Sequence, residues 1–405
     1  MIAAAFAAIS LLVVAWTLLH VGFYKHKQII DTPVYQRYGN AMADGKVPYR
    51  DFAVEYPPGA LPMFALPGLA EPGSDQQVST GFRRAFETLM WMCGAAALAA
   101  MAVVLRMLRR SDVNVWGALC FAAVAPLLLG SVILSRFDLW PAAICAAALA
   151  ALVSNRLRLG HALLGLGITA KLFPVVLVPL GVAYVWKKAG RREALACLAL
   201  VAGVVGAIFL PFVVLSPGGV WDSLSVQLTR PLQVESLGAS LLLVGHHLFG
   251  FGLAGETSHG SQNVAGTAAG VVAVASTLLQ VGVLGWIWSS FARGRGDGEA
   301  LVRSTAAALC AFVALGKVLS PQFLIWLIPI VPLVRGRRGL WASALLAAAL
   351  VLTQVWFPFR YFRLALDFEA GVSWILLARD LALVSITLLL AFTLRRRAAI
   401  RPESP

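Results

Sequence analysis

The chain has 405 residues, of which 60% are hydrophobic and 13% charged, and its formal net charge is +14. Soluble domains carry about 25% charged residues, so this composition excludes an ordinary soluble protein. The apolar runs are long, rich in Leu, Ala and Val, and without strand alternation, which predicts membrane-spanning helices.

Eight apolar segments are each near the roughly 20 residues that a helix needs to cross a bilayer. They are 1–23, 85–105, 113–134, 139–153, 194–215, 264–292, 339–357 and 373–394. The first has neither a basic start nor a small-residue cleavage site, so we expect a retained span and not a signal peptide.

Two further apolar segments, 160–186 and 304–334, have basic residues at both ends. The first contains Lys171 and the second Lys317, each followed by a proline three or four residues later. Because proline removes a helix donor and clashes with the preceding turn, we expect each segment to be a short broken hairpin. Counting each hairpin as two crossings predicts an all-α polytopic bundle of about twelve transmembrane helices.

Lys and Arg concentrate in alternate connectors. The basic ones are "RMLRRSD", "NRLR", "KKAGRRE", "RGRGDGEALVR", "RGRR" and the tail "RRRAAIRPESP". The positive-inside rule makes these connectors and both termini cytoplasmic. The net charge is therefore a signal for topology and for anionic lipid headgroups, and we predict no nucleic-acid binding.

The same pattern sets the expected organisation. We expect a single membrane domain over 1–394, with outer loops at about 24–84 and 216–263, and a basic cytoplasmic tail at 395–405. The excess of Arg over Lys and the abundance of Ala suit a GC-rich bacterium, whose plasma membrane is the expected location.

The first outer loop combines aromatic rings with carboxylates. Such pairs are typical of sugar sites, because rings stack on the C–H faces of a sugar and carboxylates accept its hydroxyl protons. The candidates for binding a sugar or an acceptor are Glu55, Tyr35, Tyr49 and Tyr56, together with Asp138, Gln322 and His246 elsewhere in the chain. The alternative is a solvated loop with tyrosines at the membrane interface.

Several cations are expected at or within the outer side of the membrane: Arg136, Lys171, Lys317 and Arg230. A charged side chain at the bilayer centre costs about 2.5–3.5 kcal/mol on insertion scales, so each needs a partner. An anionic lipid headgroup, such as a phosphate, is a suitable partner for Lys and Arg.

The order of short motifs resembles a known family. "DTPVY" is followed by "GKVPYRD", "EYPPG", "SRFDLWPA", "AKLFP" and "SPQFLIWLIP". Together they resemble the polyprenyl-phosphate-sugar-dependent glycosyltransferases of the GT-C superfamily, most of all glycosyltransferase family 87. The resemblance covers about Asp31 to Pro332. It implies a GT-C-like bundle whose outer loops form the active site.

The resemblance also implies a reaction. A sugar, mannose by first preference, would pass from a polyprenyl-phosphate donor to a hydroxyl of a lipid- or glycan-linked acceptor on the extracytoplasmic face. The matching residue implied as catalytic base is Asp31, with inversion at the anomeric carbon. The sequence has Asp31-Thr32 where many GT-C enzymes have two acidic residues, so we expect no metal and no cofactor.

Other functions stay open at this point. An arabinofuranosyltransferase of the same kind is one alternative. A transporter or flippase for a lipid-linked sugar is another, because broken helices and membrane-buried lysines occur there too. A lipid-linked polymerase or ligase would also face outward.

Each candidate residue has a purely structural alternative. Asp31 is placed to cap a helix before a proline, and Arg136 and Asp138 are close enough in sequence to pair with each other. Lys171 and Lys317 could satisfy carbonyls at the proline breaks. Glu55 and Gln322 could bond only to backbone. Arg379 and Asp380, in the last span, are predicted to be a buried structural pair.

Overall fold

The computed structural model describes residues 2–25, 29–70 and 77–392, so the predicted tail at 395–405 lies outside the described residues. The described chain is almost entirely helical and divides into two compact units. Unit 1 comprises Met1–Val178 and Leu195–Thr229, and unit 2 comprises Pro179–Ala194 and Arg230–Pro405.

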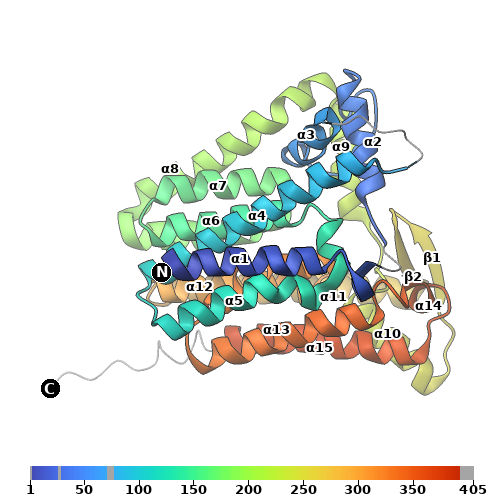
Figure 1. The fold of residues 1–405 in the computed structure, drawn as a ribbon. Coiled ribbons are helices and arrows are strands. Elements are labelled where there is room, and N and C mark those ends of the chain that lie inside the picture. Colours follow the sequence, from blue (N-terminus) through green and yellow to red (C-terminus); the bar gives the residue numbers. More distant parts are fainter. Residues whose placement is uncertain (1, 26–28, 71–76, 393–405) are drawn as a thin grey trace. The chain divides into compact units, whose positions relative to one another are not determined.

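Unit 1 is built from the N-terminal helices (Figure 1). Its α-helices are α1 (Ile2–Leu18), α2 (Thr32–Ala43), α3 (Pro62–Ala70), α4 (Thr80–Met107), α5 (Asp112–Leu129), α6 (Leu139–Val153), α7 (Leu157–Ala170) and α9 (Pro217–Thr229), with the second half of α8 (Val178–Leu215). Short 3₁₀ helices are η1 (Gly22–Lys25), η2 (Pro58–Ala60), η3 (Gly130–Leu134) and η4 (Phe173–Leu177). α6 packs between α4 and α7, and α1 packs against α4 and α5.

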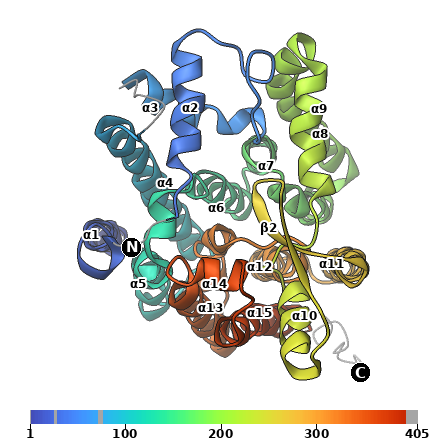
Figure 2. The same cartoon turned by 90° about the vertical axis from the view of Figure 1, so that its right-hand side faces the viewer.

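Unit 2 is built from the C-terminal helices and one β-hairpin (Figure 2). Its elements are the first part of α8, α10 (Leu237–Phe249), β1 (Ala254–Ser258), β2 (Ser261–Ala265), α11 (Thr267–Arg293), α12 (Gly298–Leu315), η5 (Pro321–Trp326), η6 (Val331–Leu333), α13 (Gly336–Trp356), α14 (Tyr361–Ala365) and α15 (Ala370–Ala391). α15 is the central helix, because it packs against α10, α12 and α13.

A buried ion pair lies on α15. Arg379 Nε is 2.8 Å from Asp380 Oδ1, and both side chains are fully buried. The guanidinium also lies over the ring of Trp356, 5.8 Å from its centroid. The predicted structural pair is therefore present, and it is held by two helices of unit 2.

The lengths and composition of the helices fit a membrane protein. Within the described residues, seven helices are long and apolar enough to cross a membrane, and six apolar helices are shorter. The expected spans correspond closely to α1, α4, α5, α6, the second half of α8, α11, α13 and α15. The chain is thus a nearly all-helical, multi-pass membrane protein, as predicted.

Both predicted helix breaks are present. α7 ends at Ala170, and the backbone of Lys171 is extended before η4 begins. α12 ends at Leu315, and the chain is non-helical until η5. The segment after the second break differs from a regular helix, because three prolines, at 321, 329 and 332, restrict it to the 3₁₀ turns η5 and η6.

The predicted basic connector "KKAGRRE" forms a kink in a long helix. It lies within α8, where Gly190 has φ +84° and ψ 174°. That conformation is open to glycine and strained for other residues, so Gly190 divides the segment into two helices.

The two predicted outer loops contain more structure than expected. The first forms α2 and α3, and the second forms α9, α10 and the hairpin of β1 and β2. The hairpin pairs Ser258 with Ser261 across His259 and Gly260, both of which have positive φ. A two-residue turn with two positive φ values has the handedness of the flanking strands.

Candidate active site

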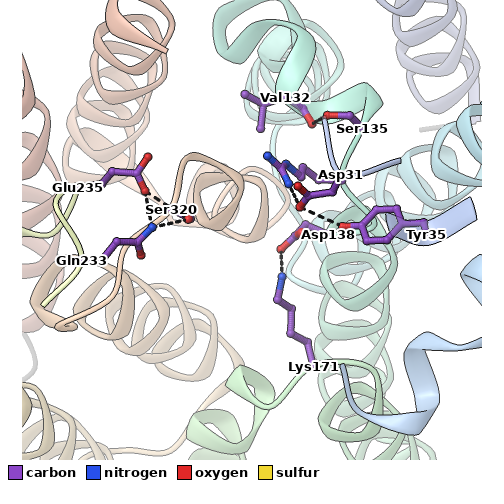
Figure 3. A network of polar contacts seen from close by, with 10 residues as sticks. Asp31, Tyr35, Val132, Ser135, Asp138, Lys171, Gln233, Glu235 and Ser320 are labelled. Atoms are coloured by element: carbon purple, nitrogen blue, oxygen red, sulfur yellow. Dashed lines mark hydrogen bonds and ion pairs between the residues drawn. The ribbon is translucent and has the colours of Figure 1, made fainter. Parts of the chain in front are cut away.

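Two ion pairs lie together in unit 1. Arg136 pairs with Asp31, and Lys171 Nζ is 2.6 Å from Asp138 Oδ1. Figure 3 shows Lys171 reaching Asp138, and the Tyr35 hydroxyl directed at Asp31. Four of the predicted site residues, from segments up to 140 positions apart in the sequence, are therefore neighbours in space.

Helix ends place these four charges. Asp31 is the N-cap residue of α2, Asp138 is the N-cap residue of α6, and Lys171 is the C-cap residue of α7. Arg136 lies in the short segment between η3 and α6. Helix ends leave backbone N–H and C=O groups without partners inside the helix, so polar side chains are common there.

The capping alternative for Asp31 does not account for its carboxylate. Asp31 occupies the N-cap position, but its side chain makes no capping hydrogen bond. Its Oδ2 accepts from the Tyr35 hydroxyl at 3.5 Å and pairs with Arg136. Arg136 and Asp138 likewise each have a partner from a different segment, so the alternative in which they pair only with each other is wrong.

The four side chains differ in exposure. The exposed fraction is 1% for Asp138, 8% for Arg136, 16% for Lys171 and 28% for Asp31. Charges this far from water need partners, because removing one member of a buried pair leaves an uncompensated charge. Asp31 is the member most open to an incoming group.

A cluster of aromatic rings packs beside the two ion pairs. The Tyr35 ring stacks on Phe64 at 4.6 Å between centroids, and Tyr56 lies edge-on to Phe137 at 4.9 Å. Phe137 also lies edge-on to Tyr35 and to Phe64, at 5.8 and 5.4 Å. The ammonium of Lys171 lies 4.8 Å from the Phe137 centroid. Phe137 thus fixes the turn that carries Arg136 on one side and Asp138 on the other.

Burial in this cluster also affects the pKa values of two tyrosine hydroxyls. Burial raises the pKa of Tyr35 well above its ordinary value, and it raises the pKa of Tyr56 as well. Both hydroxyls therefore stay protonated in any solution near neutral pH, and Tyr35 remains a hydrogen-bond donor to Asp31.

The charge pairs lie at one end of the helices of unit 1. α5 leads from the basic connector 108–111 to Arg136, and α6 leads from Asp138 to the basic connector 154–156. Both basic connectors therefore lie at the opposite end of these helices from Asp138 and from Arg136, which pairs with Asp31.

The candidate sugar- or acceptor-binding residues of the first outer loop differ in burial and in their hydrogen bonds. Tyr49 is buried, and its hydroxyl donates to the Tyr56 carbonyl at 2.6 Å. Tyr35 is 1% exposed, so its ring contacts protein on its faces. Tyr56 is half-buried, and Glu55 is exposed with its carbonyl accepting from Gln227 Nε2 at 3.2 Å. The proposed contacts of these residues with a sugar stay predictions.

Neighbouring ionisable groups of that loop are paired locally. A hydrogen bond from Arg50 lowers the pKa of Asp51 to about 2, and the Val47 N–H donates to the same carboxylate at 2.7 Å. Burial raises the pKa of Tyr38 to about 12. Asp51 is thus held by two residues close to it in the sequence, Arg50 and Val47.

Four predicted candidates belong to unit 2. Arg230 donates to the His259 carbonyl at 3.2 Å, and His246 contacts the Phe251 carbonyl through Nδ1. Lys317 and Gln322 are half-buried on either side of the second break. The Lys317 carbonyl accepts from the Gln233 N–H at 3.0 Å. Their roles in binding stay predictions.

Unit 2 contains a polar network that the sequence did not reveal as a site. Gln233 Nε2 donates to Glu235 Oε2 at 2.6 Å and to Ser320 Oγ at 3.0 Å, and Ser320 Oγ donates to Glu235 Oε2 at 3.3 Å (Figure 3). Arg379 donates to the Glu235 carbonyl at 2.7 Å. The network joins residues 85 positions apart in sequence, so no local pattern could predict it.

Removing the Glu235 carboxylate is expected to destabilise unit 2. Hydrogen bonds to charged groups contribute about 1.5–3 kcal/mol each, and Glu235 is buried. We therefore expect Glu235→Ala to lower the unfolding temperature in detergent by several degrees. Glu256→Ala is the matched control, because Glu256 accepts only an exposed bond from Ser258. Equal unfolding temperatures for both variants would contradict a structural role.

A close backbone contact supports Lys171. A Cβ on Gly59 would lie 2.4 Å from Thr169 Oγ1 and 2.8 Å from the Ala170 nitrogen. The Gly59 carbonyl also accepts from Trp140 Nε1 at 3.1 Å. Gly59 therefore holds the end of α7 against the start of α6.

Gly59→Ala is expected to displace the end of α7 and so reduce activity at least tenfold, with a loss of about 1–3 kcal/mol in stability. Activity and thermal unfolding of the purified protein check this. Gly117→Ala in α5 is the control, because a Cβ there meets nothing within 4 Å, and it should not destabilise. Full activity of Gly59→Ala would show that this contact does not position Lys171.

Among the described residues, no group of three or more His, Cys, Asp or Glu side chains could hold a metal ion. The site contains two cations, two carboxylates and several aromatic rings. Such a set can bind an anion, accept a proton and contact a sugar.

Comparisons with known proteins agree with this architecture. No curated protein matches the sequence. Among solved structures, the crystal structure of ArnT from Cupriavidus metallidurans bound to undecaprenyl phosphate is similar, with a TM-score of 0.50 and 14% identity. The match covers 99% of this chain and 81% of that chain, and at this identity it shows a shared GT-C fold.

The family is shown by the sequence itself. Residues 54–321, more than half of the chain, match the profile of glycosyltransferase family 87. That region includes Arg136, Asp138 and Lys171, while Asp31 precedes it. The chain therefore belongs to glycosyltransferase family 87.

Proposed function

We propose that the protein transfers a sugar, mannose by first preference, from a polyprenyl-phosphate donor to a hydroxyl of a glycolipid or polysaccharide acceptor. The observation that carries this proposal is the joint position of Asp31, Arg136, Asp138 and Lys171 at one end of the helices of unit 1. The likeness to a fold solved with undecaprenyl phosphate supports a polyprenyl-phosphate donor.

Asp31 is the proposed base. An acceptor hydroxyl is a weak nucleophile, and a carboxylate within hydrogen-bond reach can take its proton as the new C–O bond forms. Asp31 suits this role because it is the most exposed of the four charges and is oriented by Tyr35. Attack opposite to the phosphate inverts the anomeric carbon in one step.

Arg136 and Lys171 are the proposed phosphate ligands. The leaving phosphate gains negative charge, which cations placed beforehand stabilise. Lys317 and Arg230 remain predicted ligands of a donor phosphate. Glu55, Tyr35, Tyr49, Tyr56, Asp138, Gln322 and His246 remain candidates for the sugar and the acceptor.

The orientation follows from the basic connectors. If 108–111 and 154–156 are cytoplasmic, the opposite helix ends with Asp31 and Arg136 face outward. We therefore propose a bacterial plasma-membrane enzyme with an extracytoplasmic site and cytoplasmic termini, formed by one domain over 1–394.

A donor panel tests the function. The purified protein in lipid is given radiolabelled polyprenyl-phosphate mannose or polyprenyl-phosphate arabinofuranose, and transfer of label to a glycolipid acceptor is measured. Transfer of label from the mannose donor supports mannose as the sugar. Transfer from the arabinofuranose donor alone would show that the sugar is arabinofuranose. Movement of either donor across the bilayer without transfer would replace the proposal with a transporter.

Transfer is expected to persist in excess chelator. The reason is that Arg136 and Lys171 already supply positive charge where a metal would otherwise act. The rate with EDTA is compared with the rate in added magnesium or manganese. A loss of more than tenfold with EDTA that added metal reverses would contradict a metal-independent reaction.

A further inference from the structure

One cation in the site is already bound to the proposed base. Arg136 pairs with Asp31, and its side chain is only 8% exposed. The second pair is Lys171 with Asp138, and Asp138 is 1% exposed. The four side chains together are neutral, with two carboxylates for two cations.

In the proposed reaction, negative charge is lost from the Asp31 carboxylate and gained by the leaving phosphate. The acceptor oxygen forms a bond to the anomeric carbon, and the bond from that carbon to the phosphate oxygen breaks with its electron pair on the phosphate. The acceptor proton passes to Asp31. Asp31 therefore becomes neutral in the step in which the phosphate changes from a diester with a single charge to a monoester with a charge of about −1.5 to −2.

The ionic attraction between Arg136 and Asp31 is lost at that moment, because Asp31 becomes neutral. Coulomb attraction to a neutral carboxylic acid is small, whereas attraction to the newly charged phosphate is stronger than before. Arginine is suited to such a change because its planar group has five donors and can contact two anions in turn.

We propose that Arg136 changes partners during turnover: it holds the Asp31 carboxylate in the resting enzyme and the leaving phosphate after transfer. This proposal rests on the proposed function, because it takes Asp31 as the base and a polyprenyl phosphate as the product. Lys171 keeps its partner throughout, since Asp138 is buried and does not accept the proton. Proton acceptance and stabilisation of the leaving group are thereby linked through one side chain.

The partner change predicts how the affinity for the product, a polyprenyl phosphate, depends on Asp31 and Arg136. Asp31→Asn removes the charge as protonation does, so Arg136 becomes available to a phosphate. A polyprenyl phosphate should then bind about tenfold tighter than to the wild-type protein, which corresponds to about 1.4 kcal/mol. The gain must depend on Arg136.

The experiment is a double-mutant cycle on the full chain in lipid nanodiscs. The dissociation constant of a short-chain polyprenyl phosphate is measured for the wild type, Asp31→Asn, Arg136→Gln and the double variant. Asp31→Asn should bind more tightly, Arg136→Gln more weakly, and the double variant no more tightly than Arg136→Gln. Asp51→Asn is the control for a general charge effect, because Asp51 lies in the same outer region and pairs with Arg50.

Two results would overturn the partner change. One is an unchanged affinity in Asp31→Asn, and the other is the same gain with and without Arg136. Thermal unfolding of every variant is measured alongside, and Asp31→Ala removes the same charge if the asparagine variant does not fold.

The same data separate this inference from the proposed function. If transfer is lost in Asp31→Asn but product affinity is unchanged, the base stands and the partner change is wrong. If Asp31→Asn transfers sugar normally, or the wild type does not bind polyprenyl phosphate, the proposed function fails and the inference fails with it.

Discussion

Asp31→Asn is expected to abolish measurable transfer while leaving expression and folding intact. Loss of a general base typically lowers the rate 10²–10⁴-fold. Folding should survive because the Asp31 side chain is 28% exposed and makes no capping bond in α2, and because the amide oxygen of an asparagine can still accept a hydrogen bond from Arg136. The turnover number and the KM for the donor are measured at saturating acceptor, and the effect should lie in turnover.

The matched control is Asp51→Asn, another carboxylate of the same region that pairs with a neighbouring arginine. It is expected to transfer sugar at close to the wild-type rate. Near wild-type turnover in Asp31→Asn would remove Asp31 from the reaction and, with it, the proposed chemistry.

Lys171→Met is expected to have two effects. Use of the phosphate-linked donor should weaken, because a cation near the proposed phosphate is lost. Stability should also fall, because Asp138 is 1% exposed and would keep an unpaired charge. Breaking a buried pair from one side typically costs 3–5 kcal/mol.

A second variant separates these effects. The double variant Lys171→Met with Asp138→Asn removes both charges, so it should recover most of the lost stability. The ratio kcat/KM for the donor should stay low if Lys171 binds the phosphate. Recovery of both stability and donor use would show that Lys171 serves only to neutralise Asp138.

Much of the fold was predictable because a membrane helix can be recognised from the composition of its own segment. A run of about 20 apolar residues predicts a span without knowledge of its neighbours. The breaks after α7 and α12 were also predictable, since a proline has the same local effect in any fold.

Other parts depended on contacts distant in sequence. The hairpin at His259 and Gly260 is supported by contacts of β2 with the segment before α10: the Val234 N–H donates to the Gln262 carbonyl, and the Val264 N–H to the Leu232 carbonyl. Its strands are polar and short, so their pattern did not distinguish them from a loop. The prolines after the second break predicted an interruption but not that the following segment would consist of 3₁₀ turns.

The sequence named the four charged residues that lie together in unit 1, but not which of them pair. Family motifs and the rarity of charge in apolar sequence pointed to Asp31, Arg136 and Lys171. Which carboxylate faces which cation depends on how α2, α6 and α7 meet, and the sequence allowed Arg136 and Asp138 to pair together. The partners of Glu235 could not be predicted for the same reason, since Ser320 is far from it in the sequence.

The central place of α15 in unit 2 has a consequence for biosynthesis. Arg379 of this helix donates to the Glu235 carbonyl, 144 residues earlier in the chain. At about 5–20 residues per second, a ribosome needs on the order of 10 s to make that stretch. During this interval the nascent segments that will surround α15 have no central helix, so the core of unit 2 closes only after α15 itself has been synthesised. Insertion factors that shield polar groups in the bilayer should therefore matter more for unit 2 than for unit 1.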